Sequence, residues 1–179
     1  MRSRENKVMS IAQQDRILLA IKRMYPLEYP VFALMDEVGL RQSEALALST
    51  EDFTPHPAKI FVHTSITKLG LKSRHTRGLP LSTGLGNLIY ELANSSVSDT
   101  KLPREAHSHP RSLLMNPKTG KSWTTQHLLN VWRAVLNELG VDQVRMLDLR
   151  HNSVIRRFRA RPSKAYIAKI LGHPPRKVS

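Results

Sequence analysis

The pattern of apolar and polar positions predicts a mainly helical chain. In four segments apolar side chains recur every three or four residues, which is the spacing of one face of an α-helix. Ser10 can cap the first segment and Pro26 can stop it. Gly39 and Gly140 stand where two others should end. The four predicted helices span residues 10–25, 29–39, 83–94 and 124–140.

Two further helices are expected near the end of the chain, over 147–157 and 163–171, with Pro162 between them. The first carries a cation within its apolar stripe, since Arg150 lines up with Leu147 and Val154 on the helical period. An unpaired buried guanidinium costs several kcal/mol. We therefore expect an anion beside Arg150, supplied by the chain or by something that it binds.

The pattern changes between residues 59 and 82, where β-branched and aromatic residues flank a turn that contains Gly and Lys. This predicts two or three short antiparallel strands. Residues 95–121 are rich in Ser, Pro, His and Gly and predict a long surface loop, with a short extended piece at 112–116. The fold class is therefore α+β, mainly α-helical with a small antiparallel sheet, and residues 1–179 form a single domain.

The net charge of the chain indicates what kind of partner it binds. Lys and Arg number 28 against 14 Asp and Glu, so the formal net charge is +14. Such an excess predicts a polyanionic partner, nucleic acid above all. The chain has no cysteine, which excludes disulfides and thiolate metal sites. No run of eighteen apolar residues is present, so we expect no membrane contact and a cytoplasmic protein.

Arg41 is a second cation at a position that does not favour a positive charge. Arg41, in "GLRQSEALAL", stands at the start of a predicted helix, where the helix dipole disfavours positive charge. A guanidinium group beside free backbone amides can bind a phosphate. Glu44 can pair with Arg41 and fix the orientation of its guanidinium group. The alternative is a surface ion pair of little energetic weight.

Five stretches occur in an order that resembles the catalytic domain of the tyrosine recombinases, the phage integrase family. The resemblance runs from about residue 10 to the last residue and implies that family's fold. These stretches are "GLRQSEALAL", "ITK" with a hairpin that ends "GLPLS", "LLMNPKTGKSWTT", "LDLRH" and "KILGH".

The resemblance implies a DNA site-specific recombinase or integrase that breaks and rejoins DNA through a 3′-phosphotyrosine. Arg41 and Arg150 would bind the scissile phosphate. That phosphate would then be the anion expected beside Arg150. Lys68 would be the general acid, with Lys72 as the alternative, and His173 would contact the phosphate. His151 and Glu44 would support the site. No cofactor, metal or small-molecule substrate is implied, and self-association on DNA is expected.

Further basic residues are expected to contact the DNA backbone, the alternative being a solvated basic face. The residues concerned are Arg74, Arg77, Arg156 and Arg157.

Two departures from the family pattern stand out. Leu147 takes the place of the family's usual histidine, so a hydrogen-bond donor and base is absent. No tyrosine follows "LGH" before the chain ends, and Tyr166 is predicted to be a core residue. Three explanations stay open: the sequence is cut before the tyrosine, the gene product is a truncated relative, or another subunit supplies it. We also expect that the family's N-terminal core-binding domain is absent.

The chain is therefore expected to be inactive alone. The alternative function is a non-enzymatic DNA-binding relative, a regulator or relic, that keeps the phosphate pocket. A helical nucleic-acid-binding module unrelated to recombinases would not bring Arg41, Arg150 and His173 together.

Overall fold

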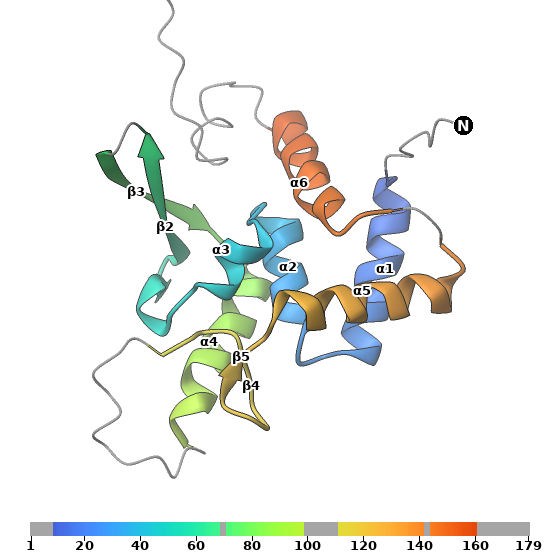
Figure 1. Cartoon of the computed structure of the whole chain (residues 1–179), viewed down its shortest axis with the longest axis horizontal. Coiled ribbons are helices and arrows are strands. Elements are labelled where there is room, and N and C mark those ends of the chain that lie inside the picture. Colours follow the sequence, from blue (N-terminus) through green and yellow to red (C-terminus); the bar gives the residue numbers. More distant parts are fainter. Residues whose placement is uncertain (1–8, 69–70, 99–110, 142–143, 161–179) are drawn as a thin grey trace, which may run out of the picture.

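The helices begin and end close to the predicted positions. The computed structural model describes residues 9–68, 71–98, 111–141 and 144–160, and Figure 1 shows a mainly helical fold with a small sheet. Helices α1 to α6 and the short 3₁₀ helix η1 are Ile11–Met24, Tyr29–Glu37, Gln42–Leu46, Thr83–Ser98, Thr125–Leu139, Leu147–Ala160 and Thr50–Asp52. Strands β1 to β5 are Phe53–Pro55, Ala58–Lys68, Leu71–Pro80, Met115–Asn116 and Lys121–Ser122.

Local capping explains several of these boundaries. Ser10 accepts a hydrogen bond from the backbone N–H of Gln13, and the Gln13 side chain accepts one in return, which closes a capping box at the start of α1. Thr124 caps α5 through its hydroxyl, which accepts a hydrogen bond from the backbone N–H of His127. Gly39 and Gly140 follow α2 and α5 with φ of 71° and 60°, the left-handed region that favours glycine.

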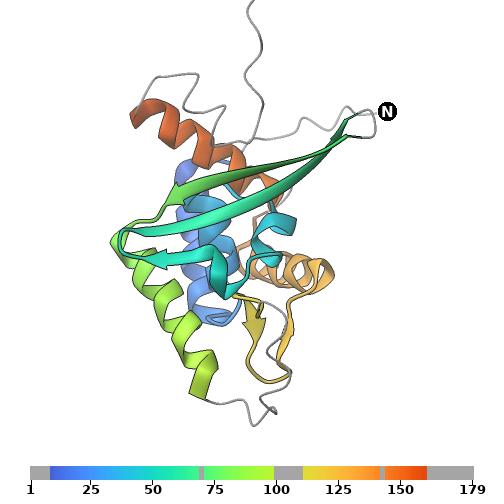
Figure 2. The ribbon, with the colours of Figure 1, turned by 90° about the vertical axis from the view of Figure 1, so that its left-hand side faces the viewer.

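The main sheet differs in two respects from the prediction. Strands β2 and β3 are 11 and 10 residues long rather than short, and they pair from Lys59 with Pro80 to Lys68 with Leu71. The third strand, β1, precedes the predicted region and pairs with β2 through a tight turn. Figure 2 shows strands β2 and β3 as a long twisted ribbon that extends away from α4.

A second, two-stranded sheet forms where a loop was predicted. The extended piece at 112–116 is found in part as β4, which pairs with β5 in the register Met115 with Ser122. Strand β5 was not predicted. The stretch also joins the rest of the fold, because Ser112 forms a bridge with Ser49 and Leu113 N–H donates to Leu48 C=O at 2.8 Å.

The core forms around α2, which contacts α1, α3, α4 and α6. Val31, Phe32 and Leu34 of this helix are fully buried. Phe32 stacks on Trp132 of α5 with ring centroids 6.1 Å apart. Trp132 Nε1 donates to Val144 C=O at 3.2 Å, so α5 is also tied to the segment that leads into α6.

Helix α6 has a more polar buried face than predicted. Leu147 is 57% exposed, so its expected place in the apolar stripe is wrong, whereas Leu149 is fully buried. Asn152 Nδ2 donates to Met9 C=O at 2.9 Å and to Gln14 Oε1 at 2.6 Å. A buried side-chain amide needs hydrogen-bond partners, and these two acceptors supply them. An apolar side chain would need none.

The helix predicted at 163–171, with Tyr166, lies outside the described residues. In the part of the chain that the structure describes, no helix is long and apolar enough to cross a membrane.

Candidate active site

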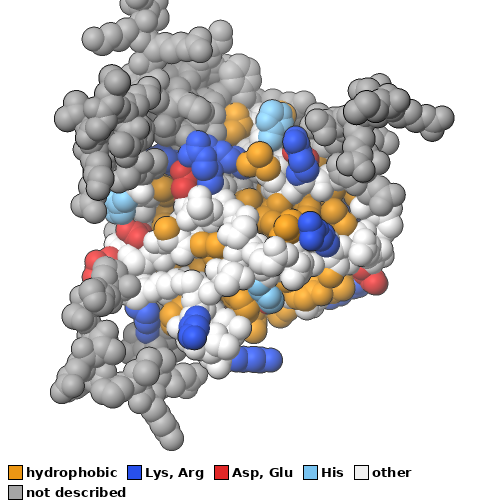
Figure 3. Space-filling model, in the orientation of Figure 1, with side chains coloured by type: hydrophobic (Ala, Val, Ile, Leu, Met, Phe, Trp, Pro, Cys, Tyr) orange, Lys and Arg blue, Asp and Glu red, His pale blue; other side chains and the backbone are white. Residues whose placement is uncertain are grey.

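Three arginine side chains from separate elements converge on the carboxylate of Glu44 in α3. Glu44 Oε1 accepts a hydrogen bond from Arg41 Nη1 at 3.0 Å. Oε2 accepts from Arg77 Nη2 of β3 at 2.8 Å and from Arg150 Nη1 of α6 at 3.3 Å. We call these four residues the Glu44 cluster. In Figure 3 basic and acidic side chains adjoin one another close to where Figure 1 places α3 and the hairpin.

Arg41 is held in place because it is the N-cap residue of α3. Its backbone is extended, and its N–H donates to Glu44 Oε2 at 2.8 Å, as in a capping box. The predicted pairing of Arg41 with Glu44 is therefore confirmed. It is not an isolated surface pair, because the same carboxylate also binds two buried guanidinium groups.

Arg150 reaches the cluster from α6, and its side chain is only 9% exposed. It also donates to the carbonyl oxygen of Gly39. Gly39 also packs closely against α6, since a Cβ added there would lie 3.2 Å from Ser153 Oγ. The expected anion beside Arg150 is thus supplied in part by the chain itself, as Glu44.

Arg77 lies in the hairpin as predicted, but its side chain points inward. We expected it to contact the DNA backbone, whereas the side chain is only 7% exposed and bonds to Glu44. The physical reason is strand alternation: Arg77 and Leu79 share one face of β3 and both are buried, whereas Thr76 and Gly78 face solvent. That alternation is the sequence signal that could have placed Arg77 inside.

The cluster keeps its ionised groups charged. Burial raises the pKa of Glu44, but hydrogen bonds from Arg41 and Arg77 and the charges of Arg77 and Arg150 outweigh it, so the net pKa is lowered. Burial lowers the pKa of Arg150, and the charge of Arg41 adds to this. Arginine still remains protonated in proteins. The site therefore holds three guanidinium groups around one carboxylate.

This arrangement is suited to an anion. Three guanidinium groups around one carboxylate carry a net charge of +2. Arg41 is the open member, with 45% of its side chain exposed, so an anion can approach from its side. Guanidinium groups match phosphate oxygens in pairs and need no metal to do so.

The two candidate lysines lie at the turn end of the β2–β3 hairpin. Lys68 is the last residue of β2 and pairs with Leu71, and Lys72 pairs with Thr67. Arg74 follows on β3 opposite Ser65. The positions of these three side chains lie outside what the structure describes, so it does not choose between Lys68 and Lys72.

The remaining predicted residues are dispersed or undescribed. His151 of α6 is exposed. His173 lies outside the described residues, as does the side chain of Arg157.

Arg156 is engaged by the chain itself. It pairs with Asp15 at 2.7 Å and Asp36 at 3.3 Å, so its expected contact with DNA would compete with two carboxylates. Burial raises the pKa of Asp36, although the charge of Arg156 opposes this. These contacts join α6 to α1 and α2, a role that the sequence analysis missed.

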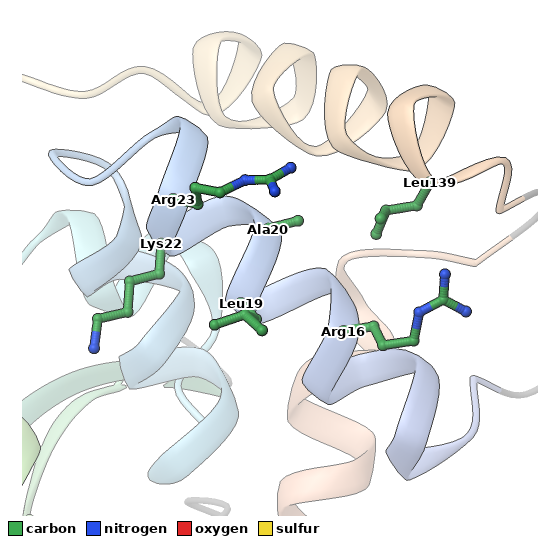
Figure 4. A pocket seen from close by; sticks show the side chains of 6 residues that line it. All are labelled: Arg16, Leu19, Ala20, Lys22, Arg23 and Leu139. Atoms are coloured by element: carbon green, nitrogen blue, oxygen red, sulfur yellow. The ribbon is translucent and has the colours of Figure 1, made fainter.

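Within the described ranges, no group of three His, Cys, Asp or Glu side chains could hold a metal ion. A separate groove lies between α1 and α5, and Figure 4 shows that none of its labelled residues belongs to the Glu44 cluster. Its lining consists of Arg16, Leu19, Ala20, Lys22, Arg23 and Leu139.

Comparison with solved structures identifies the fold. The chain resembles XerA recombinase (TM-score 0.69, 17% identity, 92% of this chain and 55% of that chain covered). It also resembles the Tn1549 transposon integrase in complex with circular intermediate DNA (0.72, 16%, 97% and 59%). A third match is a lambda integrase dimer bound to a COC′ core site (0.64, 12%, 98% and 47%).

This chain thus spans between 47% and 59% of the length of those three chains. None of the curated protein sequences matches it. The model of the phage integrase family matches residues 5–176, nearly the whole length. Together with the fold shared with tyrosine recombinases, this match confirms the resemblance seen in the motifs, and the chain belongs to the phage integrase family.

Proposed function

We propose that this chain is the DNA-cleaving domain of a site-specific recombinase or integrase, and that Arg41 and Arg150 bind the scissile phosphate of double-stranded DNA. The observation that supports this most directly is the convergence of the two arginines at Glu44, from positions 109 residues apart in the sequence. The net charge of +14 supports a DNA partner independently of the site.

The proposed chemistry follows from charge. A phosphodiester carries one negative charge, and attack by a nucleophile builds a second one on the non-bridging oxygens. Guanidinium groups held in place before the reaction stabilise that charge without reorganisation. The Glu44 cluster has a net charge of +2. This equals in size the two negative charges that the phosphate carries in the transition state.

In the proposed reaction a tyrosine oxygen bonds to phosphorus while the bond from phosphorus to the 5′ oxygen breaks. The lysine at the hairpin turn, Lys68 or else Lys72, gives its proton to the leaving oxygen. Because Leu147 stands where the family has a histidine, the tyrosine proton passes to water. Rejoining is the reverse, with a DNA 5′-hydroxyl attacking the 3′-phosphotyrosine.

Other parts of the proposal rest on the family resemblance. His173 contacts the phosphate and His151 supports the site. Arg74 and Arg157 contact the DNA backbone, and copies of the chain associate on DNA. The nucleophilic tyrosine is not assigned to any residue of this chain, so the 179-residue protein alone is expected to form no covalent adduct with DNA.

Duplex DNA binding tests the proposal. Affinity should fall steeply with salt, by about 10³-fold or more between 50 and 200 mM for six or more phosphate contacts. Arg41→Gln and Arg150→Gln should each weaken binding roughly tenfold or more beyond Arg133→Gln, since hydrogen bonds between charged groups contribute about 1.5–3 kcal/mol. Arg133 is an exposed residue of α5, so that control removes the same charge away from the cluster.

Equal losses in all three variants would contradict a phosphate site at Glu44. A covalent adduct formed by the unsubstituted chain on a nicked duplex, detected on a denaturing gel, would contradict the expected inactivity.

A further inference from the structure

We propose that Arg77 is a positioning residue that acts as the counter-ion of Glu44, so that the charges of Arg41 and Arg150 remain available to the phosphate. This inference rests on the proposed function, because it assigns a role within the same site. It replaces the sequence-based interpretation of Arg77 as a DNA-backbone contact.

The first argument is the geometry of Glu44. Its carboxylate lies at 2.8 Å from Arg77 Nη2, closer than the 3.3 Å to Arg150 Nη1. The side chains of Arg77 and Arg150 are about equally buried, at 7% and 9% exposed, so little water screens either ion pair. The shorter of the two is therefore the stronger one. Glu44 is therefore neutralised chiefly by Arg77.

The second argument is what Glu44 would do without Arg77. A buried carboxylate must be paired, and the cations left nearby would be Arg41 and Arg150. Both would then be drawn further toward Glu44 and away from an incoming phosphate. The net charge of the cluster would also fall from +2 to +1, which weakens attraction for any anion.

The third argument is the position of Arg77 in the hairpin. It lies on β3 opposite Val62 of β2, on the same strand pair that carries Lys68 and Lys72 at its turn. Its ion pair with Glu44 joins this hairpin to α3 directly. Arg77 thus also sets where the lysine-bearing strands stand relative to the two phosphate-binding arginines.

A purely structural role for Arg77 makes a different prediction. If the ion pair only stabilises the fold, removing both partners should reduce anion binding at least as much as removing one. If Arg77 balances charge, removing both partners restores a net charge of +2 and should restore binding. The double variant therefore separates the two roles.

The experiment measures the affinity of the full chain for inorganic phosphate by titration, followed through the guanidinium nitrogen resonances. Arg77→Gln should weaken binding roughly tenfold, the effect of one unit charge at about 6 Å with an effective dielectric constant of about 40. Glu44→Gln should bind more tightly than the unsubstituted chain. The double variant Arg77→Gln, Glu44→Gln should bind within about twofold of it, provided that charge alone decides.

Thermal unfolding of each variant is measured in parallel. If Arg77→Gln does not fold, the double variant, whose cluster charge is again +2, is compared with the unsubstituted chain instead, and binding roughly tenfold weaker or more would overturn the inference. Arg133→Gln is the charge-matched control and should bind phosphate as the unsubstituted chain does.

Two outcomes would overturn the inference: Arg77→Gln that binds phosphate no more weakly than Arg133→Gln, or a double variant that binds at least as weakly as Arg77→Gln. Arg41→Gln reports on the proposed function separately. If Arg41→Gln weakens phosphate binding and Arg77→Gln does not, only the inference fails. If neither weakens it, or the unsubstituted chain binds no phosphate, the proposed phosphate site fails and the inference with it.

Discussion

Replacing Glu44 by Gln should destabilise the fold by about 3–5 kcal/mol at neutral pH, the usual cost of removing one partner of a buried ion pair. The substitution leaves the guanidinium groups of Arg77 and Arg150 without their shared carboxylate, and both are less than a tenth exposed. The pair with Arg41 adds about 1 kcal/mol at most, because that side chain is 45% exposed and screened by water.

Urea unfolding gives this quantity directly. With a slope of about 2 kcal/mol per molar urea, the midpoint should fall by roughly 1.5–2.5 M. Glu138→Gln is the matched control, because it removes the same charge from an exposed position of α5. Its free energy of unfolding should change by no more than about 0.5 kcal/mol. A midpoint for Glu44→Gln within about 0.3 M of the control would refute the reasoning.

The pH dependence of the same difference provides a second check. The pKa of Glu44 in the folded protein is lowered from its ordinary value of 4.5, chiefly because its hydrogen bonds and charged neighbours outweigh burial. Its stabilising contribution is therefore complete above pH 4.5 and is lost as the pH falls through the lower folded value. The gap between the unsubstituted chain and Glu44→Gln should narrow in acid, and a gap that widens below pH 4.5 would contradict this sign.

Two further predictions concern the support of the site. Leu147→Ala should change the free energy of unfolding by less than about 0.5 kcal/mol, whereas Leu149→Ala should lower it by about 2–5 kcal/mol, because only Leu149 is buried. Equal losses for the two variants in urea unfolding would contradict the placement of α6. Gly39→Ala should cost about 1–2 kcal/mol from its positive φ alone. It should also weaken phosphate binding, because relief of that strain shifts the backbone carbonyl that accepts a hydrogen bond from Arg150. Unchanged urea unfolding and phosphate titration for Gly39→Ala would refute that role.

The sequence determined the elements whose causes are local. Helix α5 is an example: its apolar period, the cap at Thr124 and the left-handed Gly140 all lie within its own segment. The Arg41–Glu44 pair was predictable for the same reason, because a glutamate three residues after the N-cap reaches back to it, as in a capping box. The ordered motifs were also enough to indicate the family, which the match over residues 5–176 confirms.

Strands β1 and β5 were not predicted, because what makes them strands is their pairing with other segments. Strands β1 and β5 have three and two residues, too few for a recognisable alternation. Their backbones are extended because β2 and β4 lie beside them. In α6 the exposed Leu147 and the buried Asn152 reverse the expected pattern for a related reason: the surface that receives the helix presents polar acceptors from Met9 and Gln14.

The charge balance of the site was decided only by the tertiary structure. Arg77 and Arg150 lie 33 and 106 residues from Glu44, and nothing in the segment around either arginine indicates that carboxylate. A local pattern places a side chain on a face of its own strand or helix. The packing of β3, α3 and α6 against one another decides which opposite charge lies beside that side chain and whether water is excluded from the pair. These two conditions set the strength of an ion pair.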